Sequence, residues 1–408
     1  YTGKLQVNVV TRENVPVRDA TVTIAASDSP NNIIERLTTN SSGQTETVDL
    51  PAPPLELSLN EANTTRPYTT YNIRIEALGY ETEFIENAEI LPDVLAIQNV
   101  RLTSKNASLT EDIMIPDHTL YGEYPPKVPE EEIKPVNEPG EIVLSRVVVP
   151  EIIVVHDGVP SNNSAQNYYV NYRDYIKNVA SSEIYATWPT ATIEANVLAI
   201  MSFTLNRVYT EWYRNKGYDF TITSSTAYDQ KWIYGRNIFE SISLVVDNIF
   251  DQYLSRPDVR QPILTQYCDG KRVTCPNWLS QWGSCNLGER GYSTIEIIRY
   301  YYGDDMYINT AEQIAGIPIS WPGYDLDIGA SGQKVAQIQE QLDTIAQVYT
   351  AIPRLNADGI YGEVTREAVK AFQKIFDLPQ SGIVDFATWY KISQIYVGIT
   401  RIAEGIPR

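Results

Sequence analysis

Apolar and polar residues alternate along the first hundred positions, which is the pattern of strands that bury one face. The alternation is clear in Leu5-Val7-Val9 and again over residues 22–24 and 73–77. The turn-forming run 40–43, Asn-Ser-Ser-Gly, separates two of these stretches, and a last strand is expected near residues 100–102. The pattern predicts an N-terminal β-sandwich over residues 1–103.

Farther along the chain, a long helical pattern is accompanied by strand-like runs. Residues 147–155 read as strand, and apolar residues recur at helical spacing from about Thr190 to Tyr213. Pro189 is expected just outside this helix, with Thr190 as its cap and Glu194 in the first turn, where the helix dipole favours an acid. The combination predicts an α+β domain over residues 147–313.

The last part of the chain shows three short amphipathic helices. Asp385 is expected to cap the third. The predicted buried faces are Val335, Ile338, Leu342 and Ile345 in the first helix, Ala368, Val369, Phe372 and Phe376 in the second, and Trp389 and Ile392 in the third. The spacing predicts a C-terminal three-helix domain over residues 325–396, so the fold class is multidomain.

Between the first two domains, residues 104–146 interleave prolines with glutamates. This composition is typical of an extended, solvated linker. Such a segment is a simple spacer or, because its backbone would be neither buried nor paired, an accessible target for proteolysis.

The charge balance narrows the class of partner. The 408 residues carry 32 Lys plus Arg against 51 Asp plus Glu, a formal charge of -19. That sign disfavours nucleic acid and anionic membranes as partners. No apolar run is long enough to predict a membrane span.

The three cysteines, Cys268, Cys275 and Cys285, lie within one short stretch. Their spacing is not that of a standard zinc site, and the only histidines are His118 and His156. We expect a disulfide or buried thiols in preference to a metal, and no cofactor; a zinc ion bound here would be structural.

The C-terminal helices resemble the peptidoglycan-binding family of three-helix modules. The matching segments are GASGQKVAQIQEQL and ADGIYGEVTREAVKAFQKIFDLPQSGIVDFATW, which include Asp358, Gly359, Thr365 and Gln373. Glycine permits the tight turn of the Asp-Gly loop, and Thr365 is expected to cap the next helix. Most of these residues are expected to maintain the fold, whereas exposed polar groups such as Gln373 could contact a glycan or stem peptide.

The N-terminal region resembles the carboxypeptidase regulatory-like family of transthyretin-type sandwiches. The segments that carry this resemblance are GKLQVNVVTRENVPVRDATVTI, TTNSSGQTETVDL and YNIRIEALGYET. The resemblance implies a structural domain without chemistry of its own.

The middle domain resembles the SpoIID/LytB family of lytic transglycosylases and amidase enhancers. The first matching block, YIKNVASSEIYATWPTATIEANVLAIMSFTLNRVY, aligns Glu183 with the family's catalytic glutamate, although Tyr185 replaces the usual proline. The blocks TSSTAYDQKWIYG and PNWLSQWGSCNLGERGYSTIEIIRYYYGDDM follow in the family's order. Residues that we expect to bind substrate, although core packing is an equal alternative for the aromatic ones, are Trp188, Tyr228, Gln230, Gln281, Trp282 and Tyr301.

The resemblance implies a reaction that needs one carboxyl group. In a lytic transglycosylase the glutamate protonates the glycosidic oxygen and then accepts a proton from the C6 hydroxyl, which closes a 1,6-anhydro ring. Glu183 must then have a raised pKa, for which Ile184, Tyr185 and Trp188 are suitable apolar neighbours. A rival is a hydrolase with Asp229 as a second carboxylate. Glu194 is another candidate acid, but its expected place in the first turn of a helix explains it without a catalytic role.

The combination of domains resembles the SleC-type family of clostridial spore cortex-lytic enzymes. This implies an extracytoplasmic enzyme of the spore cortex and coat that cleaves cortex peptidoglycan during germination. It also implies a zymogen whose N-terminal sandwich, the prosequence, is removed by a subtilisin-like germination protease. A rival from another class is a noncatalytic wall-binding enhancer of a separate amidase, in which Glu183 would be replaceable.

Overall fold

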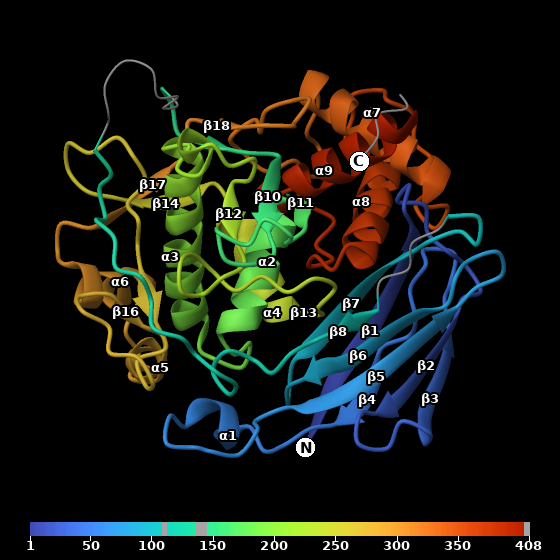
Figure 1. Cartoon of the computed structure of the whole chain (residues 1–408). Coiled ribbons are helices and arrows are strands. Elements are labelled where there is room, and N and C mark those ends of the chain that lie inside the picture. The colour runs from blue at the N-terminus through green and yellow to red at the C-terminus, as the bar shows by residue number, and fades with distance from the viewer. Residues whose placement is uncertain (108–111, 136–144, 404–408) are drawn as a thin grey trace.

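The computed structural model describes residues 1–107, 112–135 and 145–403 (Figure 1). The chain is multidomain, with an N-terminal region of two sheets, a middle region of helices and short strands, and a C-terminal helical module. Within the described residues, no helix has both the length and the apolar character needed to cross a membrane.

The N-terminal region contains two sheets, ordered β13-β7-β1-β4 and β3-β2-β5-β6-β8. Leu5, Val7 and Val9 on β1 are fully buried, which confirms the predicted alternation. At the predicted turn, Gly43 has a φ of +73°, and a Cβ there would lie 2.2 Å from the Val9 carbonyl oxygen. The elements are β1 (Thr2–Thr11), β2 (Thr21–Ala26), β3 (Ile33–Thr38), β4 (Val48–Pro51), α1 (Glu56–Leu59), β5 (Thr69–Glu76), β6 (Glu83–Ile90), β7 (Leu95–Leu102) and β8 (Ile113–Met114).

The middle region shares a sheet with the N-terminal region. Strand β13 (Ile238–Phe239) comes from the middle region and pairs antiparallel with β7. Next to it, the Asn237 side chain donates to the Glu89 carbonyl at 2.8 Å and accepts from the Glu89 N–H at 3.0 Å. The Arg236 guanidinium lies 3.6 Å from the Glu89 carboxylate, and both side chains are buried. The two regions are therefore joined by buried polar contacts.

Two helices, α2 (Tyr172–Glu183) and α3 (Thr190–Tyr209), form the buried centre of the middle region. Helix α3 was predicted to reach Tyr213 but ends at Tyr209. Pro189 occupies the cap position and Thr190 is already helical, so Glu194 lies beyond the first turn. Glu194 instead accepts a hydrogen bond from the Thr294 hydroxyl at 2.5 Å.

The other elements of the middle region surround these two helices. They are β9 (Val148–Val149), β10 (Ile152–His156), β11 (Asn167–Asn171), the short 3-10 helix Arg214–Lys216, β12 (Ile222–Thr223), α4 (Glu240–Ile249), β14 (Gln252–Ser255), β15 (Tyr267–Cys268), β16 (Leu279–Ser280), α5 (Gln281–Glu289), α6 (Thr294–Tyr302), β17 (Tyr307–Thr310) and β18 (Gln313–Ile314).

The C-terminal module contains the three predicted helices, α7 (Gln333–Val348), α8 (Glu363–Ile375) and α9 (Phe386–Ala403). Of the predicted faces, Phe376 is half-buried just beyond the end of α8 and every other residue is buried. The Asp385 carboxylate accepts from the Thr388 N–H at 2.9 Å, which confirms it as the cap of α9. Thr365 is not a cap, because α8 starts at Glu363 and Gly362 holds that position.

Residues Ile115–Pro135, here called the strap, differ from the predicted solvated linker. They lie along the middle region as the blue-green trace beside α3 in Figure 1. Leu120, Tyr124 and Lys134 are each less than 10% exposed. The Val128 N–H donates to the Ala227 carbonyl at 2.7 Å, so the backbone is also paired. The predicted unpaired backbone is therefore wrong where these contacts are made, whereas residues such as Pro125, Pro126 and Glu131 are exposed, as predicted. Residues 108–111 and 136–144 of the same segment lie outside the described part.

The buried Glu89–Arg236 pair makes the stability of this interface depend on pH. Burial raises the pKa of Glu89 to about 7, and the Arg236 charge only partly opposes this. In the unfolded chain the pKa is about 4.3, so the folded state binds the proton more tightly. The contribution to stability is thus present below about pH 4 and is lost as the pH rises towards about 7, by about 3 kcal/mol.

Urea unfolding between pH 4 and 8 checks this prediction. The free energy of unfolding of wild type should fall across that window relative to Glu89→Gln, whose side chain does not titrate. A difference between the two proteins that stays constant with pH would contradict the prediction.

Candidate active site

Glu183 is the last residue of α2, and its side chain is completely buried. Its Oε1 atom accepts a hydrogen bond from the Lys231 N–H at 2.8 Å. Its Oε2 atom has no hydrogen-bond partner of good geometry within the described residues. Burial raises the pKa of Glu183, because a carboxylate removed from water loses its hydration. One oxygen is therefore anchored by the main chain, and the Tyr267 hydroxyl also acts on the carboxyl group as a hydrogen-bond donor.

Tyr267 of β15 and two residues of the strap interact electrostatically with this carboxyl group. The Tyr267 hydroxyl and the Lys127 ammonium both act to lower the pKa of Glu183, against the larger effect of burial. The Lys127 Nζ lies 4.5 Å from the centroid of the Tyr267 ring and donates to the Asp229 carbonyl at 3.3 Å. The charge of Glu183 also raises the pKa of the buried Tyr124 hydroxyl. Lys127 and Tyr124 both belong to the strap.

The apolar neighbours that the sequence suggested for Glu183 form a separate aromatic cluster. Tyr185 and Trp188 pack with Trp282, the Trp188 and Trp282 rings being 5.2 Å apart. The Trp188 indole N–H donates to the Ser58 carbonyl of the N-terminal region at 2.8 Å. Both tryptophans are less than 5% exposed, so in this conformation they pack in the core and at the regional interface instead of offering a sugar platform.

The predicted polar ligands of the substrate are also enclosed. The Gln230 carboxamide is held by Tyr175, Thr204 and the Ile200 carbonyl, and is fully buried. Gln281 is fully buried as well, but neither polar atom of its side chain has a partner within the described residues. Gln230 therefore has a complete structural role, whereas Gln281 keeps bonding capacity that nothing else in its surroundings uses.

Asp229, the second carboxylate of the rival mechanism, is part of a buried hydrogen-bond network. Arg207 donates to it at 2.7 Å, the Tyr213 hydroxyl at 2.6 Å, and the N–H and hydroxyl of Thr223 at 3.1 and 2.7 Å. A carboxylate that accepts four hydrogen bonds inside the protein is poorly placed to activate water. The geometry disfavours Asp229 as a catalytic partner.

Two of the predicted substrate-binding tyrosines reach the surface. Tyr228 is 38% exposed, and Tyr301 is half-buried and lines a cavity of about 340 Å³ together with Trp278 and Ser280. A second cavity, of about 460 Å³, is lined by the stacked rings of Tyr168 and Tyr234 and by Lys231, whose N–H binds Glu183. The second cavity is thus connected to Glu183 through Lys231.

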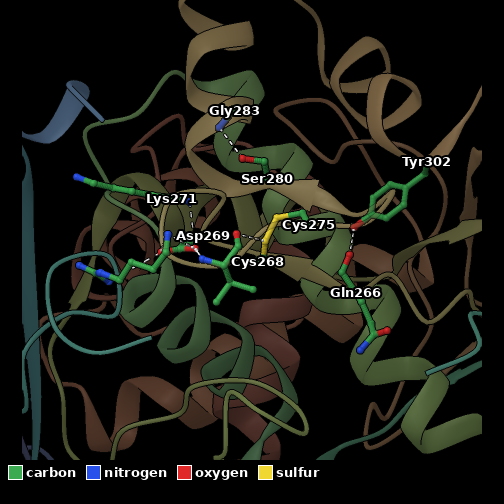
Figure 2. The surroundings of a disulfide bond; sticks show 10 residues. Gln266, Cys268, Asp269, Lys271, Cys275, Ser280, Gly283 and Tyr302 are labelled. Carbon is green, nitrogen blue, oxygen red and sulfur yellow. Dashed lines mark hydrogen bonds and ion pairs between the residues drawn. A yellow bond between two sulfur atoms is a disulfide. The ribbon is translucent and has the colours of Figure 1, made fainter. Parts of the chain in front are cut away.

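Figure 2 shows the disulfide that closes the loop next to the site. Cys268 is bonded to Cys275, and Cys285 is a buried free thiol, which decides between the alternatives that the sequence left open. The Asp269 carboxylate accepts from the N–H groups of Lys271, Arg272 and Val273, which shapes this loop. Within the described residues, no group of three or more His, Cys, Asp or Glu side chains is arranged to hold a metal ion.

In the C-terminal module, the predicted recognition residues are used inside the fold. Gln339 donates to the Asp358 carboxylate at 3.1 Å and to the Thr365 hydroxyl at 3.0 Å, and it accepts from the Gly359 N–H at 2.9 Å. Gln373 repeats this arrangement one helix later, with Gly382 and Thr388. Gln373 is 1% exposed, so the expectation that it contacts a glycan is wrong.

Residues 331–392 match a family described as "Putative peptidoglycan binding domain". No curated protein matches the chain. Among solved structures, the chain is similar to the SleB N-terminal domain, with 26% identity over 19% of this chain and 99% of that chain and a TM-score of 0.17.

Two other solved structures also cover part of the chain. The Bacillus anthracis TIE protein shares 14% identity over 25% of this chain and 16% of that chain, with a TM-score of 0.18. A cohesin–X-dockerin complex from Acetivibrio cellulolyticus shares 17% identity over 25% of this chain and 58% of that chain, with a TM-score of 0.17. The TM-scores are too low to indicate a common overall fold, so the family match is the informative comparison.

Because Asp229 neutralises a buried arginine, its replacement should destabilise the protein. Asp229→Asn leaves the fully buried Arg207 paired with Glu130 alone, and we expect the free energy of unfolding to fall by about 3 kcal/mol. Urea denaturation measures this loss. The control is the exposed neighbour Tyr228→Phe, which should change stability by less than about 0.5 kcal/mol. An Asp229→Asn protein of full stability that lacks enzymatic activity would instead assign Asp229 to catalysis.

Proposed function

We propose that this protein is a lytic transglycosylase of peptidoglycan and that Glu183 is its single acid and base. The observation that carries the proposal is the state of the Glu183 carboxyl group. It is fully buried, its pKa is raised by burial, one oxygen is anchored by Lys231, and the other has no partner of good geometry within the described residues. A carboxyl group in this state is suited to give up a proton near neutral pH.

The reaction requires two proton transfers. Glu183 first protonates the oxygen between the muramic sugar and the next sugar, and the bond from C1 to that oxygen breaks. The resulting carboxylate then takes the proton of the muramic C6 hydroxyl, whose oxygen forms the new bond to C1. The product carries a 1,6-anhydro ring, and the proton balance on Glu183 is restored without water.

The state of the two aspartates that interact with Lys127, among the described residues, favours this route over hydrolysis. Lys127, which faces Glu183, also interacts with Asp229 and Asp269. Asp229 accepts four hydrogen bonds from Arg207, Tyr213 and Thr223, and Asp269 accepts those of the disulfide loop. A glycosidase that uses water needs a second carboxylate to activate it. Both of these acids are already committed to structural contacts.

The substrate class is supported by the C-terminal module. Its match to a peptidoglycan-binding family supports peptidoglycan as the partner, and the Cys268–Cys275 disulfide fits a location outside the reducing cytoplasm. The spore cortex and a role in germination rest on the resemblance of the domain combination to SleC-type enzymes.

The uncut chain is proposed to be a zymogen that a subtilisin-like protease activates. Glu183 has no exposed surface while residues 1–135 are in place, and Tyr124 and Lys127 of the strap surround it. Removal of the N-terminal part would open the site.

Analysis of the products from spore cortex tests the reaction. A sequence-specific protease site placed after Arg146 allows the full chain to be made and then cut. We expect cut wild type to release glycans with anhydro-muramic ends, and Glu183→Gln to be slower by about 10³-fold, which is the scale of lost general acid catalysis. Glu289→Gln, at an exposed position of α5, is the matched control and should keep full activity.

Other outcomes would point elsewhere. Reducing ends would indicate a hydrolase with a second carboxylate. The noncatalytic enhancer would be indicated by two results together. The cut wild type would release no glycan, and both wild type and Glu183→Gln would stimulate a separate amidase.

Wall binding must use side chains that point out of the C-terminal module. Ile360, in the Asp-Gly loop, and Val364, in the first turn of α8, are each 61% exposed. We expect Ile360→Asp and Val364→Asp to weaken binding of the full chain to purified cortex peptidoglycan by about tenfold, the cost of two or more buried methylene groups. Lys370→Ala on α8 is the control. A sedimentation assay measures the binding, and unchanged binding by both variants would move the contact surface to another face.

A further inference from the structure

The strap is fixed to the middle region along its described length. Near its start, the Arg272 side chain donates to the carbonyls of Thr119, Leu120 and Tyr121 at 2.8–3.0 Å. Near its end, the Gln261 side chain accepts from the Lys134 N–H at 2.8 Å and donates to its carbonyl at 2.7 Å. These backbone contacts hold the strap in one register.

A buried ion pair adds to these contacts. The Arg207 guanidinium donates to both oxygens of Glu130, at 2.9 and 2.7 Å, while the same side chain binds Asp229. Lys134 pairs with Glu130 from the other side at 2.5 Å. A two-pronged arginine–carboxylate pair out of water is one of the stronger polar contacts in proteins. It lies only three residues after Lys127.

Between these anchors the strap places Lys127 at the candidate catalytic carboxyl. Pro125, Pro126 and Pro129 flank Lys127 and restrict the backbone to extended conformations. Its ammonium group lies over the Tyr267 ring and acts on the charge of Glu183. No contact between the N-terminal sheets and the Glu183 carboxyl group is found in the described residues. The sheets reach the middle region at β13, Arg236 and Trp188 instead.

We infer that the strap, and not the two-sheet region, is the inhibitor of the enzyme, with Lys127 as an internal pseudo-ligand that occupies the site of the substrate at Glu183. This inference rests on the function proposed above and specifies how the site is regulated. Blocking is steric, because Lys127 lies over the Tyr267 ring and on the Asp229 carbonyl, two residues before the Lys231 N–H that binds the carboxyl group. It is also electrostatic, because a nearby ammonium group favours the ionised carboxylate, whereas the reaction begins with the protonated acid.

The order of segments along the chain makes this inference testable. A cut before the strap breaks its covalent link to the two-sheet region, with which β8, Ile115 and His118 still make hydrogen bonds, and leaves it joined to the middle region by the chain that follows it. A cut after the strap leaves Lys127 on the N-terminal fragment. Cuts on both sides release the strap as a separate peptide while the two-sheet region keeps its own contacts. If the strap is the inhibitor, only the cuts that free it will activate the enzyme.

The experiment uses the full chain with sites for two different specific proteases, one between Lys105 and Asn106 and one after Arg146, both exposed positions. The doubly cut protein is passed through gel filtration to remove the strap fragment. We expect the protein cut only at the first site to have less than a tenth of the activity of the doubly cut protein. Equal activity after the first cut alone would overturn the inference and leave the proposed function intact. Doubly cut Glu183→Gln reports any activity that does not come from this site.

A binding measurement keeps the inference testable apart from activity. A fluorescent synthetic peptide of residues 115–135 is titrated into the doubly cut, filtered protein, and its anisotropy is followed. We expect binding that weakens at least tenfold in the Lys127→Ala peptide and stays the same in the peptide with Glu131→Gln, an exposed position. No binding of the wild-type peptide, or equal binding of the Lys127→Ala peptide, would contradict the inference even if the proposed reaction were wrong.

Discussion

The arrangement of the candidate site depends on one costly feature, a carboxyl group buried at the end of a helix. Glu183 ends α2 with no exposed surface, and an ionised carboxylate in such a place is unfavourable unless a cation or hydrogen bonds compensate it. The chain supplies the Lys231 N–H group, the Tyr267 hydroxyl, and the charges of Lys127 and Lys231. Of these groups, Lys127 comes from the strap, outside the middle region. The resting state of the carboxyl group therefore depends in part on a segment that precedes the middle region in the chain.

The strap is held by polar contacts as well as by a few apolar side chains. Charged and main-chain hydrogen bonds anchor it at Arg272, Arg207 and Gln261, while its buried apolar residues Ile115, Leu120 and Tyr124 lie near its start. Once the chain is cut, water can replace such contacts at smaller cost than it can cover exposed apolar surface. The same Arg207 keeps Asp229 as a partner when Glu130 leaves, so the middle region is not left with an unpaired buried charge. The strap is thus held mainly by contacts that water can replace.

The sequence predicted local structure well and long-range contacts poorly. Periodicity identified β1, α3 and the helices of the C-terminal module, because a buried face repeats along one element. The resemblance to the SpoIID/LytB family, carried by three sequence blocks in the family's order, led to Glu183. It did not reveal Tyr267 or Lys127 as neighbours of Glu183, since each comes from a segment whose composition gives no sign of its partner. The strap was misjudged because its prolines and glutamates suggest solvation. The apolar and lysine side chains that make its buried contacts are few, and their irregular spacing gives no periodic signal.

Helix α2 also links the candidate active site to the wall-binding module. The Asp247 carboxylate of α4 is fully buried and lies 2.9 Å from Lys177 and 3.6 Å from Lys391 of α9, and these cations lower its pKa to about 2. Arg173, in the first turn of α2, also donates to the Tyr390 carbonyl at 2.9 Å. Because a buried cluster with several cations and one acid tolerates little displacement, α9 and α2 must move together. The opposite end of α2 carries Glu183. The C-terminal module and Glu183, the candidate catalytic residue, are thus both joined to the same helix, α2.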